Sequence, residues 1–166
     1  MTVHRIHPID HPMLRRKASR IGRITPDIRV FVEDMFETMV ANHGVGLAAP
    51  QIGRPWRVIV LDADGESVAI INPEIVRRAG SITADEGCLS FPNWFGPVTR
   101  HQTVTVKGAN ADGKEVRYRL RDIAARVVQH EIDHLDGIIF IDRLTDPSLL
   151  RFVDPRSPEA QRLHVS

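Results

Sequence analysis

Two helical segments that enclose a block of short strands limit most strongly how this chain can fold. Residues 26–42 and 123–136 place apolar side chains at helical spacing, and a glycine that can end a helix follows closely after each. Between them, apolar runs at 56–61 and 67–71 are joined by turn residues rather than by crossover helices. We therefore expect an α+β fold with mainly antiparallel sheets packed around a central C-terminal helix, and with an N-terminal helix.

A β-hairpin is the clearest strand prediction in this block. Residues 102–107 and 115–120 alternate apolar and polar side chains, and an Asn-Ala-Asp-Gly turn lies between them.

The Asn72-Pro73 pair predicts the end of the strand before it, because proline cannot donate a hydrogen bond to a sheet. Residues 138–141 suit a last short strand.

The length of the chain predicts a single domain that spans residues 1–166. A chain of 166 residues can bury a sizeable core without disulfides, and its one cysteine, Cys88, cannot form an internal one. Pro155 and Pro158 disfavour a helix in the tail. We therefore expect the residues from about 146 to 166 to be peripheral.

Charge and hydropathy exclude several classes of partner. The chain has 22 Lys and Arg against 21 Asp and Glu, so its net charge of +1 gives no reason to expect direct DNA binding. No apolar run approaches the length of a membrane span, and the first residues contain no hydrophobic signal core. We expect a cytoplasmic protein without a membrane partner.

The strongest chemical signal lies in the second helical segment, at residues 129–134. His130 and His134 are four residues apart, so both imidazoles project from one face of a helix and can hold one metal ion. Glu131 stands beside them, where a carboxylate can act as a general base. This segment therefore predicts a metal site with hydrolytic chemistry.

Two histidines leave a catalytic site short of a ligand, because such sites usually have three protein ligands and a water. Downstream carboxylates are weak candidates, as they follow no matching motif: Asp142, Asp146 and Glu159. The upstream candidate is Cys88, which follows a glycine in what the sequence suggests is a polar loop. With Cys88 as the third ligand, a tetrahedral metal would keep one position for water.

Two other interpretations share the paired histidines. A zinc-dependent peptidase would use a downstream third ligand and give no role to Cys88. A structural metal domain would need a fourth protein ligand, for which Asp85 and Glu86 are the nearest candidates, and it would not require Glu131.

Three segments, taken in order, resemble the signature motifs of the peptide deformylase family. They are Gly44-Val45-Gly46-Leu47-Ala48-Ala49-Pro50-Gln51, Glu86-Gly87-Cys88-Leu89-Ser90 and Gln129-His130-Glu131-Ile132-Asp133-His134. Residues 10–15 and 140–144 also fit, so the resemblance covers roughly residues 8–145.

The resemblance implies an enzyme that removes the N-formyl group from the N-terminal methionine of newly synthesised polypeptides and releases formate. The implied metal ligands are Cys88, His130 and His134. The implied metal is natively Fe(2+), with Zn(2+), Ni(2+) or Co(2+) possible in purified protein. A metal-bound water would be the nucleophile and Glu131 the general acid/base.

The resemblance also implies how the substrate is held. Gln51 by its side chain and Leu89 by its backbone N–H would donate to the formyl oxygen. Backbone contacts to the methionine residue would come from Val45, with Gly46 beside it, and from Gly87. For the walls of the apolar pocket that receives the first side chain, we suggest Val45, Ile123, Val127 and the His130 ring.

The remaining implications concern partners and two departures from the family. The expected partners are N-formylmethionyl nascent peptides, with a transient ribosome contact, although the tail does not resemble the basic helix by which several relatives dock. Arg100 matches a family arginine with a structural pairing role. Trp94 and Phe95 depart from the family pattern and either line the mouth of the site or pack a loop.

Overall fold

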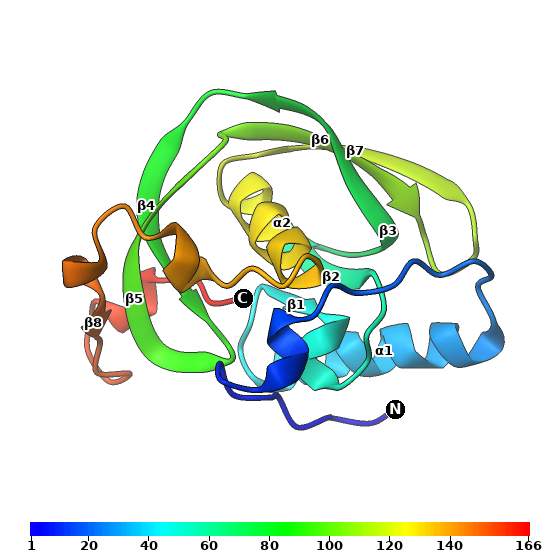
Figure 1. Cartoon of the computed structure of the whole chain (residues 1–166), viewed down its shortest axis with the longest axis horizontal. Helices are drawn as coiled ribbons and strands as arrows, with labels where there is room; N and C mark the ends of the chain where they lie inside the picture. The colour runs from blue at the N-terminus through cyan, green and yellow to red at the C-terminus, as the bar shows by residue number, and fades with distance from the viewer.

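The computed structural model describes residues 1–166 and has two α-helices among eight β-strands (Figure 1). Helix α1 spans Pro26–Ala41, with a proline in its first turn, and helix α2 spans Asp122–Leu135. Both agree with the helices predicted from apolar spacing. Five short 3-10 helices complete the helical elements: Pro12–Arg15, Ala49–Ile52, Phe140–Arg143, Pro147–Leu149 and Ala160–Arg162.

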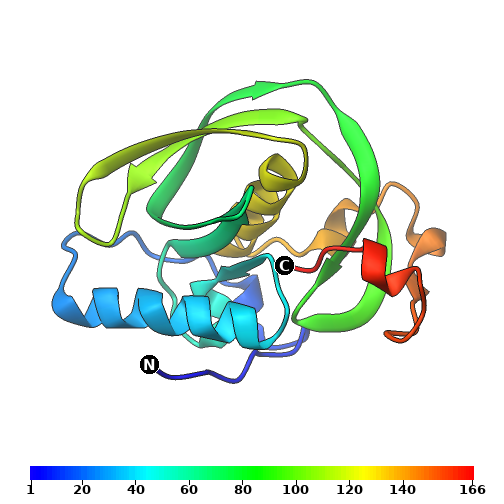
Figure 2. The ribbon, with the colours of Figure 1, turned by 180° about the vertical axis from the view of Figure 1, so that it is seen from behind.

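The strands form two antiparallel sheets. The larger has the order β1-β2-β3-β6-β7, with strands β1 (Gly46–Ala48), β2 (Val58–Ala63), β3 (Glu66–Ala79), β6 (Thr103–Ala109) and β7 (Glu115–Arg121). The smaller has the order β4-β5-β8, with strands β4 (Ile82–Cys88), β5 (Phe91–Arg100) and β8 (Arg151–Phe152). Figures 1 and 2 show both sheets curving around α2, which confirms the expected α+β architecture.

Strand β2 lies at the centre of the packing because both of its faces are buried. Ile59 and Leu61 belong to the cluster formed with α2, while Val58 and Val60 belong to the cluster formed with α1. The continuous apolar run of this strand therefore reflects a position between two helices. The α2 cluster is the larger one, and it fixes the metal-binding face of that helix relative to the sheet.

Two strand predictions were wrong in their extent or type. Strand β3 continues through Asn72-Pro73 to Ala79, because a register shift between Ile71 and Glu74 places the proline where the ladder is interrupted. Asn72 adopts a left-handed φ of 52° in this irregularity. Residues 138–141, expected to be a strand, lead instead into the 3-10 helix at Phe140–Arg143.

The hairpin prediction is confirmed by the pairing of β6 with β7. The Asn110 side chain accepts hydrogen bonds from the backbone N–H groups of Asp112 and Lys114, both at 3.0 Å, and so fixes the turn. No helix in the structure has the length and apolar character needed to cross a membrane.

The tail follows the smaller sheet and then returns to the centre of the molecule. Residues 151–152 form β8 on the edge of β5, and the chain end marked C in Figures 1 and 2 lies beside α2. There Val165 and Ser166 contact the backbone of residues 45, 87 and 89. The first part of the tail lies at the periphery, and its last residues lie inside the molecule.

Candidate metal-binding site

Helix α2 and the end of β4 bring three metal-binding side chains together. Cys88, His130 and His134 are all buried, and their ligand atoms lie within 4.8 Å of one another. The Cys88 Sγ is 3.4 Å from His134 Nε2, and the two imidazole rings are 5.0 Å apart between centroids. Cys88 lies at the buried end of strand β4 rather than in the polar loop we expected.

The polar atoms of this cluster have the pattern expected of a site built for a cation. The buried side-chain atoms that lack a hydrogen-bond partner are His130 Nε2, His134 Nδ1 and both carboxylate oxygens of Glu131. Leaving such atoms without a partner is costly in a folded protein, and unmatched groups usually mark a ligand or ion position. Two imidazoles and a thiolate suit Zn(2+), Fe(2+) and similar divalent ions, so the donor set fits a metal.

A buried ion-pair network holds the first histidine in place. His130 Nδ1 donates to the Glu86 carboxylate at 2.9 Å, and this leaves Nε2 directed away from the carboxylate. Glu86 also accepts two hydrogen bonds from Arg100, at 2.8 and 2.9 Å, and one from Arg126 at 2.7 Å. Arg100 donates further to Asp133, which confirms its expected structural pairing.

This network sets the charge of its own members. Burial alone would raise the pKa of Glu86, but hydrogen bonds from Arg100 and His130 outweigh burial and hold that pKa well below its usual range. Burial alone would lower the pKa of Arg100, but the carboxylates of Glu86 and Asp133 outweigh burial and raise that pKa. Glu86 is therefore a charged orienting group, and its oxygens are already engaged by three partners.

The other carboxylates that we considered as ligands lie outside the cluster. Each is bound elsewhere: Asp85 by Arg151, Asp142 by Arg15, Asp146 by Ser148 and Glu159 by Arg151. The structure thus places Cys88, rather than a downstream carboxylate, beside the two histidines. This arrangement favours neither the peptidase nor the closed structural site.

Glu131 lies against backbone that only glycine permits. A Cβ added to Gly46 would stand 2.6 Å from Glu131 Oε1 and 2.7 Å from a Val127 methyl group. Burial raises the pKa of Glu131 to about 7, and the neighbouring Ser166 side chain and His130 act in the opposite direction. A carboxyl group that titrates near neutrality is suited to both accepting and donating a proton.

The expected oxyanion donors lie next to the cluster. Gln51 is buried, its Nε2 is 3.6 Å from Cys88 Sγ, and its Oε1 accepts a hydrogen bond from the backbone of Ala48 at 2.9 Å. The Leu89 N–H donates at 2.8 Å to the main-chain oxygen of Ser166. The backbone N–H of Val45 donates at 2.7 Å to the oxygen of Val165.

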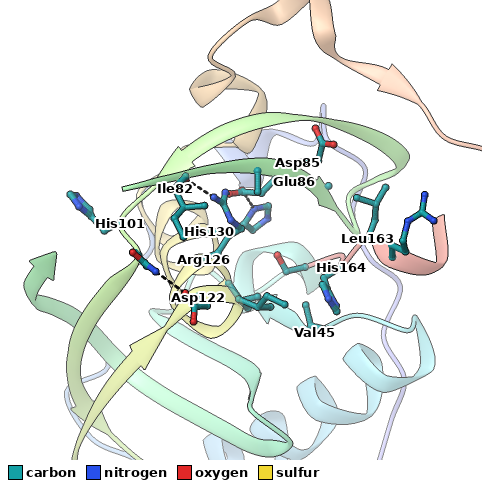
Figure 3. Close-up of a pocket in the computed structure, with 17 residues that line it drawn as sticks. Val45, Ile82, Asp85, Glu86, His101, Asp122, Arg126, His130, Leu163 and His164 are labelled. Carbon is teal, nitrogen blue, oxygen red and sulfur yellow. Dashed lines mark hydrogen bonds and ion pairs between the residues drawn. The ribbon is translucent and has the colours of Figure 1, made fainter. Parts of the chain in front are cut away.

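The suggested pocket residues share one cavity of about 420 Å³ (Figure 3). Val45, Ile123, Val127 and His130 all line it, together with Gly87, Arg126 and residues 162–164 of the tail. Figure 3 shows Leu163 and His164 on the side of the cavity opposite Ile82. The structure therefore brings these side chains together, although their contact with a substrate stays a prediction.

Trp94 and Phe95 take different positions. Phe95 is buried behind Gly87, where an added Cβ would stand 2.5 Å from its ring. The Trp94 ring stacks on the Phe91 ring with their centroids 5.6 Å apart, and it packs edge-on against the Phe152 ring. Both side chains thus pack the smaller sheet, and neither lines the cavity described above.

Sequence reasoning missed two parts of the site. Arg126 is one turn before His130 on α2, and this spacing could have indicated a partner for an acidic residue near the first ligand. The return of residues 163–166 had no local signal, because it depends on the path of the whole chain.

Two histidines from a helix and a cysteine from the end of a strand could hold a metal ion, and a buried glutamate lies on the same helix, which is the arrangement expected of a metal-dependent hydrolase. The family model for polypeptide deformylase matches residues 3–149. The chain belongs to this family, which confirms the resemblance seen in its motifs. Members of the family are metalloenzymes that remove the N-formyl group from nascent peptides.

Individual relatives agree over most of the chain. The peptide deformylase of Thermomicrobium roseum is 45% identical over 168 aligned positions, and the alignment covers 96% of this chain and 96% of the relative. That of Desulforudis audaxviator is 49% identical over 147 residues, or 87% of this chain and 96% of the relative. The crystal structure of the Thermotoga maritima peptide deformylase has a TM-score of 0.85 at 41% identity and covers 88% of this chain and 100% of that chain.

Proposed function

We propose that this chain hydrolyses the N-formyl group of N-formylmethionyl nascent peptides at the Cys88, His130 and His134 site, with Glu131 as general acid/base. The observation that carries the proposal is the group of unpartnered buried atoms beside the cysteine, which belongs to two histidines and one glutamate. These ligands suit several divalent ions. We propose Fe(2+) as the native one because it is the metal that the resemblance to the family implies.

The roles of the residues follow from their positions. A divalent ion, when bound, supplies Lewis-acid polarisation and activates water for attack. Glu131, with a pKa raised to about 7 by burial, accepts a proton from the attacking water and later delivers it to the departing amine. Gln51 Nε2 and the Leu89 N–H donate to the oxygen on which negative charge develops, and losing one such donor typically costs about 2.7–4 kcal/mol of barrier.

The walls of the site explain selectivity for a formyl group. The formyl carbon carries a hydrogen where a peptide carbonyl carries Cα, so a confined position at the oxyanion donors would admit the first and exclude the second. The backbone of Val45, Gly46 and Gly87 would align the first residue, and Ile123 and Val127 would receive its side chain. We place this activity in the cytoplasm, with transient ribosome contact supplying the substrate.

Formate release from formyl-Met-Ala by anaerobically prepared protein, with metal analysis of the same sample, tests the proposal. We expect Glu131→Ala to keep its metal and lose about 10²–10⁴-fold in kcat, the usual contribution of a general acid/base. Cys88→Ser should lose metal, while Glu115→Ala, on an exposed strand end, should behave as the parent chain. A Cys88→Ser variant that keeps both metal and activity would overturn the proposal.

A further inference from the structure

Residues 163–166 form an extended segment inside the site. The main-chain oxygen of Val165 accepts from the Val45 N–H at 2.7 Å, and that of Ser166 accepts from the Leu89 N–H at 2.8 Å. Val165 also pairs with Gly87 as a parallel bridge. The segment thus joins the start of the larger sheet to the end of β4 in the manner of an added strand.

The backbone groups that hold this segment are those assigned above to the substrate. Val45 and Gly87 are proposed to align the first residue of a formylated peptide, and the Leu89 N–H is proposed to donate to its formyl oxygen. A backbone N–H has one hydrogen and forms one strong hydrogen bond, so the segment and a substrate cannot both use it. Ser166 is also 6% exposed and lines the same cavity as Val127 and His130, where a substrate would be held.

The segment is attached to the rest of the protein by few contacts. Val153 is buried, and between it and Ser166 no residue is buried. Residues 154–165 therefore contribute no buried side chain to the core, which is typical of a region that opens locally at low cost. The anchor at Val153 keeps the segment near the site at an effective concentration on the order of millimolar.

We propose that residues 163–166 are an internal competitive ligand, which occupies the peptide-binding groove between Val45 and Leu89 and yields to substrate. This inference rests on the proposed function for the identity of the competitor. If the intrinsic dissociation constant of the segment for the groove equals its effective concentration, the segment occupies the groove half of the time. The apparent KM for substrate would then be raised about twofold, without a change in kcat.

The kinetic test compares the metal-loaded parent chain with a variant that lacks residues 163–166 and with Val165→Pro. The second variant keeps the chain length, but the proline ring fixes φ at the bridging residue and restricts the backbone of the residue before it, which should disturb the pairing with Gly87. Both should lower KM for formyl-Met-Ala about twofold or more at unchanged kcat. Arg156→Ala, whose side chain is 87% exposed, is the matched tail control and should leave KM unchanged.

The second arm measures occupancy without turnover. A synthetic peptide of residues 160–166 should compete with substrate in the shortened variant, and the same peptide with proline at the Val165 position should not. Hydrogen exchange at the Leu89 amide should be slower in the parent chain than in the shortened variant.

The outcomes separate the two proposals. Loss of formate release in every chain would refute the proposed function, while peptide binding and Leu89 exchange would still decide the role of the segment. Unchanged KM in Val165→Pro, with equal Leu89 exchange in the parent and shortened chains, would refute the internal ligand. A fall in kcat and in Tm at constant KM would also refute it, because the segment would then be structural.

Discussion

Replacing Arg100 with methionine should weaken both the fold and the metal site. The Arg100 side chain is 4% exposed and binds Glu86 through two nitrogens and Asp133 through the third. Methionine keeps much of the apolar stem but removes the charge. Glu86 would keep Arg126 and His130 as partners, and Asp133 would keep Arg143.

The magnitude follows from burial and from those remaining partners. Removing one member of a buried ion pair costs about 3–5 kcal/mol, and the lower end applies here because neither carboxylate loses all of its partners. We expect a loss of about 3 kcal/mol in the free energy of unfolding, which for a chain of this size lowers Tm by about 6–12 °C. Loosening Glu86 should also weaken metal affinity about 10- to 100-fold, since it orients His130.

Urea unfolding of metal-free protein measures the stability term, and competition with a chelator measures metal affinity separately. Arg151→Met is the matched control, because its side chain is 40% exposed and its ion pairs with Asp85 and Glu159 should each be worth at most about 1 kcal/mol. A double-mutant cycle with Glu86→Gln should give a coupling of about 0.5–3 kcal/mol. If Arg100→Met lowers the free energy of unfolding by no more than Arg151→Met does, the reasoning is refuted.

Three further predictions concern the site. Gly46→Ala should cost about 1–3 kcal/mol of stability and lower kcat by displacing Glu131. Gly22→Ala is the control and should change neither, because an added Cβ there meets nothing within 4 Å. Equal Tm and kcat for the two variants would contradict this prediction. Val127→Phe should raise KM for formyl-Met substrates, and steady-state kinetics with unchanged KM would remove this residue from the pocket. Adding divalent metal to metal-free protein should raise Tm in calorimetry, and the rise should be much smaller for Cys88→Ser, because only folded chains with all three ligands bind tightly.

The elements with strong periodicity were predictable from the sequence. Helices α1 and α2 carry apolar stripes with clear ends, and the β6–β7 hairpin has a turn whose side chain satisfies its own backbone. The smaller sheet escaped prediction because β5 contains Pro92, Gly96 and Pro97, which read as loop residues. The strands of this sheet are fixed by pairing between residues far apart in the sequence, which no local pattern indicates.

The site shows the same division between local and non-local information. The spacing of His130 and His134 is a property of one helix, so the pair could be inferred directly. Cys88 could be named as a candidate third ligand because the helix lacks one donor, but no local pattern places it beside the histidines, since its contact with α2 spans 46 residues to His134. Neither spacing nor composition could show residues 163–166 in the groove.

The separation of the three ligands along the chain affects when the ion can bind. In the unfolded polypeptide, the helix that aligns the two histidines is not yet formed. The cysteine reaches them only after the smaller sheet has assembled, so the unfolded chain offers a metal ion no more than two neighbouring histidines. Tight capture therefore follows folding rather than guiding it. Once captured, the ion would cross-link the two sheets through α2, so oxidation of a single sulfur would free one sheet from that cross-link.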